Sequence, residues 1–286
     1  MGSSRCGNDL LLSVITPCLN AVDTIGDTLL SIAQLSRLLQ EQGLALEHLV
    51  IDGGSQDGTL ELLNEYAYQH EYCTLIKDVG GGPYVAMNVG LAAAQAHFTH
   101  ILNADDLIWD LPGYVALLQR GLLCNAQVLL ASIVYFRRPD WSVRSVWIVD
   151  CPPTQSGQWH RQLLRGLHYP HPGFIARTPL YRAHGFDLRF SFSADYHLMQ
   201  KLMLEVKCID EVCCSEIPLV AMAEGGVTSN WRSILAGFFQ LRAINRELGI
   251  HAPAGLRYLT KARRRFLAKW LVSYARTPSR LRQASR

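Results

Sequence analysis

Short apolar runs and amphipathic stretches alternate along the first 106 residues of the chain. The apolar runs have the length of buried strands, and the stretches between them show the spacing of helices. Strands separated by helices in this way predict an α/β fold with a mainly parallel sheet and helices on both faces. We expect strands at 11–20, 46–54, 73–79 and 98–106, and helices at 24–42, 58–69 and 83–96.

Polar, glycine-rich loops follow each of these four strands. Open parallel sheets bind their ligands at the carboxyl ends of the strands, where such loops meet. The clustering of carboxylates and glycines at this edge therefore predicts a ligand site. The positions concerned are Thr16, Pro17 and Asn20, then 52–59, 78–84 and 103–106.

The fourth loop carries two adjacent carboxylates directly behind an apolar strand. Asp105 and Asp106 would repel each other and lose hydration at a buried strand end, so their charge must be compensated. Mg²⁺ and Mn²⁺ favour carboxylate oxygens and can neutralise a leaving diphosphate. For an isolated pair, capping of the following turn would be the preferred explanation. Because four polar loops converge here, we favour a metal–diphosphate site.

The second loop, DGGSQDGT at 52–59, is not a known phosphate-binding fingerprint. The chain contains neither a G-x-G-x-x-G dinucleotide motif nor a Walker lysine, which weakens dehydrogenase and P-loop interpretations. Asp57 and Thr59 fit the N-cap of the following helix. Asp52 fits either a turn or a carboxylate that accepts hydrogen bonds from a nucleotide base or ribose, and we favour the nucleotide.

A helix in the second half, expected at 195–205, begins with a carboxylate among aromatic side chains. Asp195 follows Phe190 and precedes Tyr196. An N-cap role would explain it. A carboxylate in partly dry surroundings is also a candidate general base, because desolvation raises its proton affinity. Of four nearby histidines, whose spacing matches no helical metal pair, His171 is the one that we would test.

The remainder of the second half shows weaker periodicity. Strand patterns occur at 128–136, 141–150 and 208–224. From residue 231 onward the pattern is helical, apart from a break near Pro253. We therefore expect a main domain at 9–230 and a C-terminal helical, basic extension at 231–286.

Two features indicate a cytoplasmic location. The apolar piece near the N-terminus is too short for a signal peptide, and no run approaches the roughly 18 apolar residues of a membrane span. The eight cysteines are scattered without a CxxC pair, which argues against a zinc site. We expect mostly buried, reduced thiols rather than a structural disulfide.

Basic residues are concentrated near the C-terminal end. Residues 257–286 hold ten Lys and Arg and no Asp or Glu, which leaves 17 basic and 24 acidic side chains, a net charge of −7, for residues 1–256. In this segment aromatic and aliphatic residues alternate with the cations at helical spacing. The pattern suits a peripheral helix on the anionic inner face of a membrane. A solvated basic helix and a nucleic-acid patch are the alternatives, and we favour the membrane.

Seven motifs together resemble glycosyltransferase family 2, in the right order over about residues 11–230: VITPCLN, VIDGGSQDGT, GGGPYVAMNVGL, ILNADD, HPGFIAR, GFDLRFSFSADYHLMQKL and EGGVTS. The chain looks most like the bacterial branch that builds surface polysaccharides, including colanic-acid-type enzymes. The resemblance implies a glycosyltransferase-A fold with a Rossmann-like sheet, and makes 9–230 the catalytic domain. It also implies an inverting transfer, dependent on Mn²⁺ or Mg²⁺, from a UDP- or GDP-sugar to a glycan or lipid-linked acceptor.

The resemblance further implies roles for individual residues. Asp195 would be the base that deprotonates the acceptor hydroxyl. Asp105 would bind the metal, and Asp106 would support the metal or the ribose. The nucleotide-sugar pocket would include Thr16, Pro17, Asn20, Asp52, Ser55, Asp78, Asn103 and Asp106. The acceptor side would include His171, Arg177 and Tyr196.

Four positions depart from the usual motifs of the family. Asn103 stands at the first position of D-x-D, and Gly53 replaces the second Asp of DDGS. Val85 replaces the Asp common in YDAMN, and Gly80 replaces one residue of a preceding acidic pair. The last two changes remove polar groups near the donor sugar. They motivate an alternative hypothesis, a non-catalytic nucleotide-sugar-binding protein on the same fold.

Overall fold

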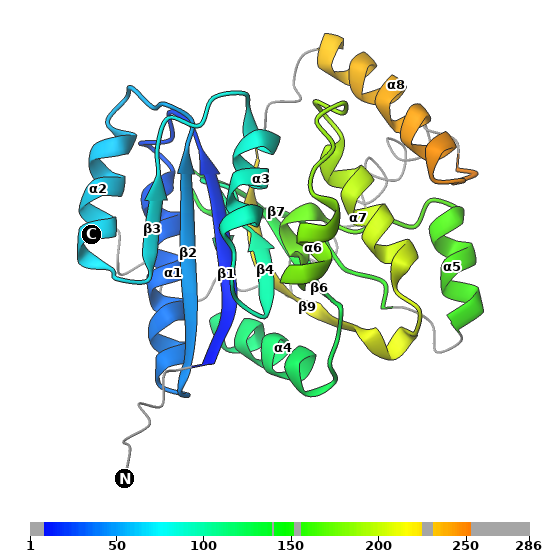
Figure 1. The fold of residues 1–286 in the computed structure, drawn as a ribbon, viewed down its shortest axis with the longest axis horizontal. Coiled ribbons are helices and arrows are strands. Elements are labelled where there is room, and N and C mark those ends of the chain that lie inside the picture. Colours follow the sequence, from blue (N-terminus) through cyan, green and yellow to red (C-terminus); the bar gives the residue numbers. More distant parts are fainter. Residues whose placement is uncertain (1–8, 139, 152–155, 225–230, 253–286) are drawn as a thin grey trace.

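The computed structural model describes residues 9–138, 140–151, 156–224 and 231–252, which form a nine-stranded sheet with helices on both faces (Figure 1). The strands are β1 (Asp9–Cys18), β2 (Leu44–Asp52), β3 (Cys73–Ile76), β4 (Phe98–Ile101), β5 (Leu107–Ile108), β6 (Val128–Arg137), β7 (Ser142–Trp147), β8 (Phe174–Arg177) and β9 (Val212–Ala223). The helices are α1 (Ile25–Gln40), α2 (Thr59–Gln69), α3 (Pro83–Ala93), α4 (Leu111–Leu123), α5 (Ser156–Leu164), α6 (Thr178–His184), α7 (Ala194–Glu205) and α8 (Trp231–Glu247). Two short 3-10 turns are η1 (His171–Gly173) and η2 (Ile209–Glu211).

The strand order confirms the predicted parallel arrangement of the first half. The strands run β3-β2-β1-β4-β8-β6-β9-β5, with β7 paired to β6. β1 is parallel to both β2 and β4, and β3 is parallel to β2. The later strands add antiparallel pairs, because β8 runs against both β4 and β6. Helical crossovers in the first half bring the carboxyl ends of β1–β4 to one edge.

Alternate residues of β1 point to opposite faces of the sheet, and a separate apolar cluster covers each face. Ile15 packs in a cluster with residues of α3, α5, α6 and α7. Val14 packs on the other face with residues of α1 and α4. Gly90 lies where α3 crosses β1, and a Cβ there would stand 2.4 Å from Cγ2 of Ile15. The close approach of α3 to β1 therefore requires this glycine.

Several strands are shorter than the sequence predicts. β3 ends at Ile76 and β4 at Ile101, because the polar loops that follow them leave the sheet. The region 208–224 contains one long strand, β9, rather than several. The two residues of β5, immediately behind the acid pair, pair antiparallel with Val220 and Ala221 of β9.

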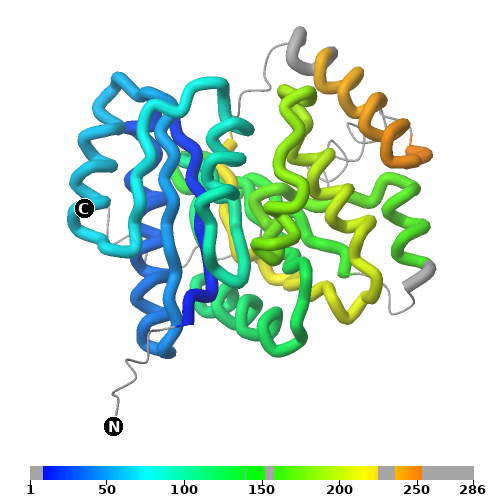
Figure 2. Tube along the Cα trace, viewed as in Figure 1, coloured from blue at the N-terminus to red at the C-terminus, as the bar shows by residue number. Residues whose placement is uncertain are grey.

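Helix α8 packs on the same core as α7. Leu241 and Ile244 are buried in the cluster that includes Leu202 and Met203 of α7. Figure 2 shows α8, in orange, beside α7. The division of the chain at residue 230 stays a prediction. The expected break near Pro253 and the basic segment 257–286 lie outside the described residues.

The structure joins Cys151 and Cys214 in a disulfide, so the expectation of reduced thiols throughout is corrected at this pair. Their Cα atoms are 5.9 Å apart, a spacing typical of disulfides. Cys214 is in register with Leu130 of β6, and β7, which precedes Cys151, also pairs with β6. The two cysteines are 63 residues apart in sequence, so only the strand pairing reveals their proximity. Five other described cysteines are free thiols.

Candidate active site

The loops after β1, β2 and β4 lie at one edge of the sheet, as their spacing predicted (Figure 1). β1 and β2 end side by side, because Cys18 is in register with Asp52. β4 lies on the other side of β1, where Ile101 is in register with Ile15. The acidic loop after β4 is therefore separated from the end of β2 by β1 alone.

Asp52 is fully buried and shapes the second loop. Its Oδ2 accepts hydrogen bonds from the backbone N–H groups of Gly54 and Ser55 at 2.9 and 3.0 Å, and its Oδ1 accepts the Ser55 hydroxyl at 2.5 Å. The Asp52 carbonyl accepts the N–H of Val79 from the third loop at 2.9 Å. Of the two roles that the sequence allows for Asp52, turn residue or nucleotide contact, these hydrogen bonds fit the turn. They fix the second loop and the start of the third.

Asn20 joins the first loop to the second. Its backbone N–H donates to Ser55 Oγ at 2.8 Å, and its Oδ1 accepts the N–H of Gln56 at 2.9 Å. The Asn20 backbone has a φ of 50°, which asparagine tolerates better than most residues. Asp78 is exposed and has a φ of 59°. The structure therefore brings Asn20 and Ser55 together with Asp52.

Thr16 and Pro17 are buried within β1 rather than exposed at the sheet edge. The Thr16 hydroxyl lies 2.9 Å from Nε2 of His48, which is also fully buried. Burial lowers the pKa of His48 to about 3, so its imidazole is neutral at pH 7. The Thr16 hydroxyl is thus engaged in a hydrogen bond inside the sheet, and its position gives no support to a pocket-lining role.

Asp106 is buried behind Asp105. Its Oδ2 accepts from Nδ2 of Asn103 at 3.0 Å, and its Oδ1 accepts the N–H of Ala223 at 3.3 Å. Burial and the adjacent Asp105 charge raise the pKa of Asp106 well above its ordinary value. Because both oxygens already accept hydrogen bonds, the geometry fits a supporting role better than direct metal ligation.

Asp105 has the geometry of a cation ligand. Its side chain is only partly exposed, and burial raises its pKa. Within the described ranges, no other residue's N–H or O–H donates to its carboxylate. Its oxygens are therefore available for a divalent cation, and the second buried carboxylate adds the negative charge that such a cation requires. Asp105, backed by Asp106 and Asn103, fits the implied Mn²⁺ or Mg²⁺.

Arg138, which belongs to none of the motifs, also contacts the acidic loop. Its Nη2 donates to the carbonyl of Asp105 at 3.0 Å, and its charge opposes the effect of burial on the Asp105 pKa. The guanidinium also lies 5.8 and 5.9 Å from the ring centres of Phe136 and Trp141. An arginine behind the nine-residue apolar run 128–136 is the sequence signal that could have found it.

Asp195 lies in the first turn of α7, and its carboxylate contacts a residue from a distant segment. The Tyr84 hydroxyl, from the start of α3, donates to Asp195 Oδ1 at 3.2 Å. The Asp195 charge also acts on His171, partly opposing the burial that lowers the pKa of this imidazole. Nε2 of His171 is buried without a hydrogen-bond partner among the described residues. Because α3 follows the β3 loop, the structure groups Asp195, Tyr84 and His171 on that side of the fold.

Arg177 and Tyr196 do not join this group. Arg177 is in register with Phe98, at the amino end of β4 and thus at the opposite edge of the sheet. Its guanidinium donates to the Ala126 carbonyl at 2.9 Å. The Tyr196 hydroxyl donates to Asn245 of α8 at 3.0 Å. Both side chains hold the fold together, and neither position supports the expected acceptor-side role.

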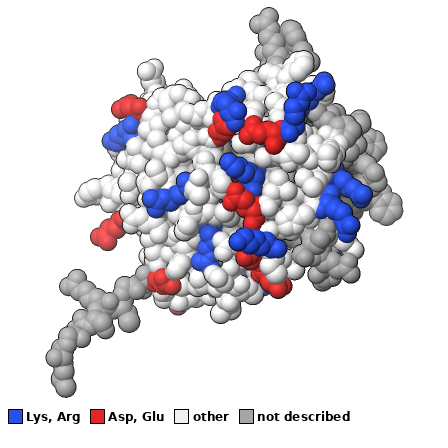
Figure 3. Space-filling view, turned by 45° about the vertical axis from the view of Figure 1, so that its right-hand side comes forward, with Lys and Arg blue, Asp and Glu red and all other residues white. Residues whose placement is uncertain are grey.

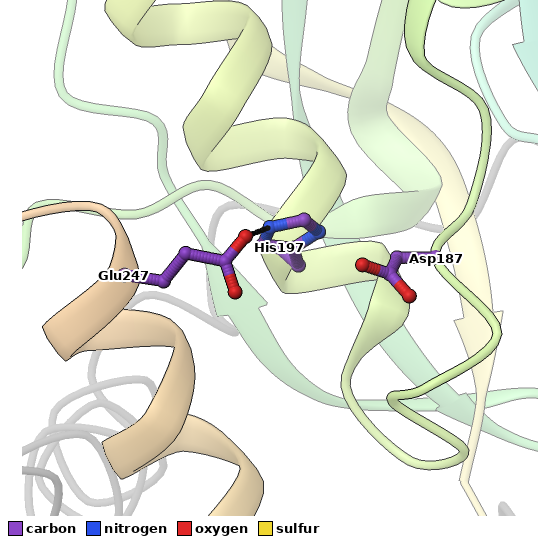
Figure 4. A group of neighbouring side chains, drawn as sticks. All are labelled: Asp187, His197 and Glu247. Carbon is purple, nitrogen blue, oxygen red and sulfur yellow. Dashed lines mark hydrogen bonds and ion pairs between the residues drawn. The ribbon is translucent and has the colours of Figure 1, made fainter.

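Asp187, His197 and Glu247 form a second group of potential metal ligands (Figure 4). One ligand atom from each lies within 4.8 Å of the others, and Nε2 of His197 is 3.2 Å from Glu247. Arg189 bridges the two carboxylates, with Nε 2.9 Å from Asp187 and Nη2 3.3 Å from Glu247. Because a guanidinium already pairs with both carboxylates, we interpret the group as an ion-pair network that fastens α8.

Comparison with known sequences gives a family and several bacterial relatives. The sequence profile of glycosyl transferase family 2 matches residues 13–187. The uncharacterized glycosyltransferase YibD of Escherichia coli (strain K12) is 31% identical over 98 residues, covering 34% of this chain and 27% of that protein. The putative teichuronic acid biosynthesis glycosyltransferase TuaG of Bacillus subtilis (strain 168) is 34% identical over 97 residues, covering 34% and 36%. The matched stretches span about a quarter to a third of these relatives.

Solved structures share the fold. S. aureus TarS 1-349 superposes with a TM-score of 0.62 at 19% identity, over 82% of this chain and 64% of that chain. The mannosyltransferase PcManGT from Pyrobaculum calidifontis, in complex with GDP-Man and Mn²⁺, superposes with a TM-score of 0.54 at 18% identity, over 98% and 80%. These likenesses confirm the expected glycosyltransferase-A fold. The family profile covers more than half of the chain, including β1–β4 and the loops that carry the acidic residues, and the chain therefore belongs to glycosyl transferase family 2.

Proposed function

We propose that this chain is an inverting, metal-dependent glycosyltransferase that moves a sugar from a UDP- or GDP-sugar to an acceptor hydroxyl. The observation that carries the proposal is the arrangement of carboxylates: an acid pair behind β4, partly exposed at Asp105 and buried at Asp106, and Asp195 beside the helix that follows the β3 loop. Family membership supports the reaction class. TarS in complex with UDP-GlcNAc and PcManGT with GDP-Man and Mn²⁺ have the same fold, which supports a nucleotide-sugar donor.

In the proposed reaction, Asp195 accepts the proton of the acceptor hydroxyl. The acceptor oxygen then forms a bond to the anomeric carbon of the donor sugar from the face opposite the leaving group. The bond from that carbon to the diphosphate oxygen breaks, and its electron pair leaves with the nucleoside diphosphate. A positioned base of this kind usually contributes about 10²–10⁴-fold to the rate.

Asp105 would hold the divalent cation, and Asp106 and Asn103 would keep the loop in place. When bound, the cation would neutralise the charge that develops on the leaving diphosphate. Asn20, Ser55, Asp78 and Asn103 are the remaining candidates for nucleotide contacts. Asp52 would act by shaping the loop beneath the nucleotide.

Asp195→Asn tests the base, because the amide keeps the shape of the carboxylate and can still accept from Tyr84. We expect the variant to show a normal melting temperature and to retain stabilisation by nucleotide plus Mn²⁺, but to lose transfer by about 10²–10⁴-fold. Asp23→Asn, at an exposed position near the start of α1, is the matched control and should transfer at the wild-type rate. Transfer by Asp195→Asn at the wild-type rate would refute the assignment.

A non-catalytic nucleotide-sugar-binding protein is the second candidate, motivated by Val85 and Gly80 at positions where the family usually has polar groups. A panel of UDP- and GDP-sugars with Mn²⁺ separates the two candidates. Stabilisation by a donor without release of nucleoside diphosphate, in the presence of saccharide and lipid-linked acceptors, would favour binding alone. Release and transfer would favour the enzyme.

The acceptor side is proposed to involve an anionic membrane surface through residues 257–286. Among the described residues, no helix is long and apolar enough to span a bilayer. On the face in Figure 3, Lys and Arg side chains are interspersed with Asp and Glu and form no large patch of one sign. We assign the proposed membrane contact to the basic segment 257–286. Co-sedimentation with anionic liposomes, with and without residues 257–286, tests this role, and equal binding by both chains would exclude it.

A further inference from the structure

Tyr84 and Asp195 are 111 residues apart in sequence but are joined by a hydrogen bond. The phenolic hydroxyl of Tyr84 lies 3.2 Å from Oδ1 of Asp195. Burial and the negative charge of Asp195 raise the pKa of Tyr84 far above its ordinary value. The phenol is therefore protonated at pH 7, and it is the donor in this pair.

The neighbours of Tyr84 hold its ring in place. Its ring stacks on Phe186, with centroids 5.5 Å apart and an interplanar angle of 21°. One turn further along α3, Asn88 binds both backbone groups of Phe186: Nδ2 donates to the carbonyl at 2.9 Å, and Oδ1 accepts the N–H at 2.7 Å. Phe186 is itself buried. Tyr84 and Asn88 thus lie on one face of α3 and bind the segment around Phe186 that leads into α7.

Helix α3 therefore connects the two halves of the proposed site. It begins directly after the glycine-rich loop 78–82, at the edge where the donor is expected. Through Tyr84 and Asn88 it contacts the turn at Phe186 and the first turn of α7. Figure 2 shows the segment between α6 and α7 in light green beside α3. A displacement of α3 would move the donor-side loop and Asp195 together.

We propose that Tyr84 is a positioning residue for Asp195, an inference that rests on the proposed role of Asp195 as the base. The hydrogen bond fixes Oδ1, which leaves Oδ2 to accept the proton of the acceptor hydroxyl. Tyr84 itself exchanges no proton in the reaction.

Tyr84→Phe is the decisive variant, because it keeps the ring that stacks on Phe186 and removes only the hydroxyl. Nucleoside diphosphate release is measured on the full chain, with Mn²⁺ and the donor that the panel of nucleotide sugars identifies. We expect kcat to fall about tenfold, with a change of less than twofold in KM for the donor.

Tyr181→Phe is the matched control. Tyr181 is a buried tyrosine of α6 whose hydroxyl donates to the Phe174 carbonyl at 3.4 Å. Removal of this hydroxyl should leave kcat at its wild-type value. Thermal unfolding of both variants confirms that they are folded.

The outcomes separate the inference from the proposed function. A Tyr84→Phe enzyme with wild-type kcat would overturn the positioning role. So would a rise in the KM for the donor as large as the fall in kcat, which indicates a structural effect on the site as a whole. If Asp195→Asn instead transfers at the wild-type rate, the proposed base is wrong, whatever Tyr84→Phe shows.

Discussion

The guanidinium of Arg138 donates from Nη2 to the backbone carbonyl of Asp105 at 3.0 Å. The same group pairs with Asp27 of α1 at 2.5 Å and donates to the Thr24 carbonyl at 3.2 Å. A single side chain at the end of β6 thereby ties the acidic loop to the start of α1. Its charge also favours the ionised forms of Asp105 and Asp106, against the burial that raises the pKa of both.

Replacement of Arg138 by Met should loosen the acidic loop. The side chain is only 20% exposed, and its loss leaves a carboxylate and two carbonyls without this donor. We expect a loss of about 1–3 kcal/mol in the free energy of unfolding and weaker stabilisation by nucleotide with Mn²⁺. Arg144→Met, at an exposed position on the neighbouring strand β7, should change neither quantity. Equal melting temperatures and nucleotide responses for Arg138→Met and wild type would contradict this account.

Asp105→Asn should abolish the part of nucleotide-dependent stabilisation that requires Mn²⁺. The carboxylate is the proposed cation ligand, whereas its amide is a much weaker one. Thermal shift with UDP or GDP, with and without Mn²⁺, measures the effect. Asp187→Asn is the comparison, because it removes a carboxylate from the other potential ligand group while leaving Asp105 intact. If only Asp187→Asn eliminates the Mn²⁺ response, the cation site has been assigned to the wrong group.

His48 should make the protein less stable in acid. Its pKa is about 3 in the folded protein, compared with an ordinary value of 6.5. As pH falls below 6.5, the unfolded chain binds the proton first, so the free energy of unfolding decreases by up to about 1.4 kcal/mol per pH unit until pH 3. Asp106, whose pKa is raised, acts in the opposite direction, so the comparison is made between variants. Unfolding of His48→Gln between pH 6.5 and 4 should show a weaker loss than wild type, and parallel curves would contradict the assignment.

Gly90→Ala should destabilise the packing of α3 on β1. The added methyl would stand 2.4 Å from Ile15 Cγ2, and overpacking of this kind costs about 1–3 kcal/mol. Gly80→Ala is the matched control in the preceding loop, because a Cβ there meets nothing within 4 Å. Chemical denaturation should show a lower midpoint for Gly90→Ala alone. A Gly90→Ala midpoint equal to that of Gly80→Ala would mean that α3 can shift without cost.

The sequence was sufficient to predict the parallel half of the sheet because each element there has a local signal. β1 and β2 are mainly apolar runs, and polar, glycine-rich loops mark their ends. The shared edge followed from the topology of parallel strands, since β1 pairs with both β2 and β4. The acid pair also has a local signal, because two adjacent carboxylates directly behind an apolar strand require a compensating charge.

The remaining contacts of the site depend on distant residues and have no local signal. Arg138 meets Asp105 only because β6 lies in the same sheet as β4. The location of Arg177 had no local signal either, because a motif fixes its sequence neighbours but not the strand direction, and the antiparallel β8 carries it to the opposite edge. The Tyr84–Asp195 contact likewise requires the turn at Phe186, which sequence periodicity cannot place.

The burial of Leu241 and Ile244 against α7 limits how far the chain can be shortened. A fragment that stops at residue 230 would expose Leu202 and Met203 to solvent and would remove the Glu247 partner of Arg189 and His197. The exposed apolar surface would lie on α7, the helix that carries Asp195. A truncation that removes the basic segment but keeps these contacts must therefore retain residues 231–252.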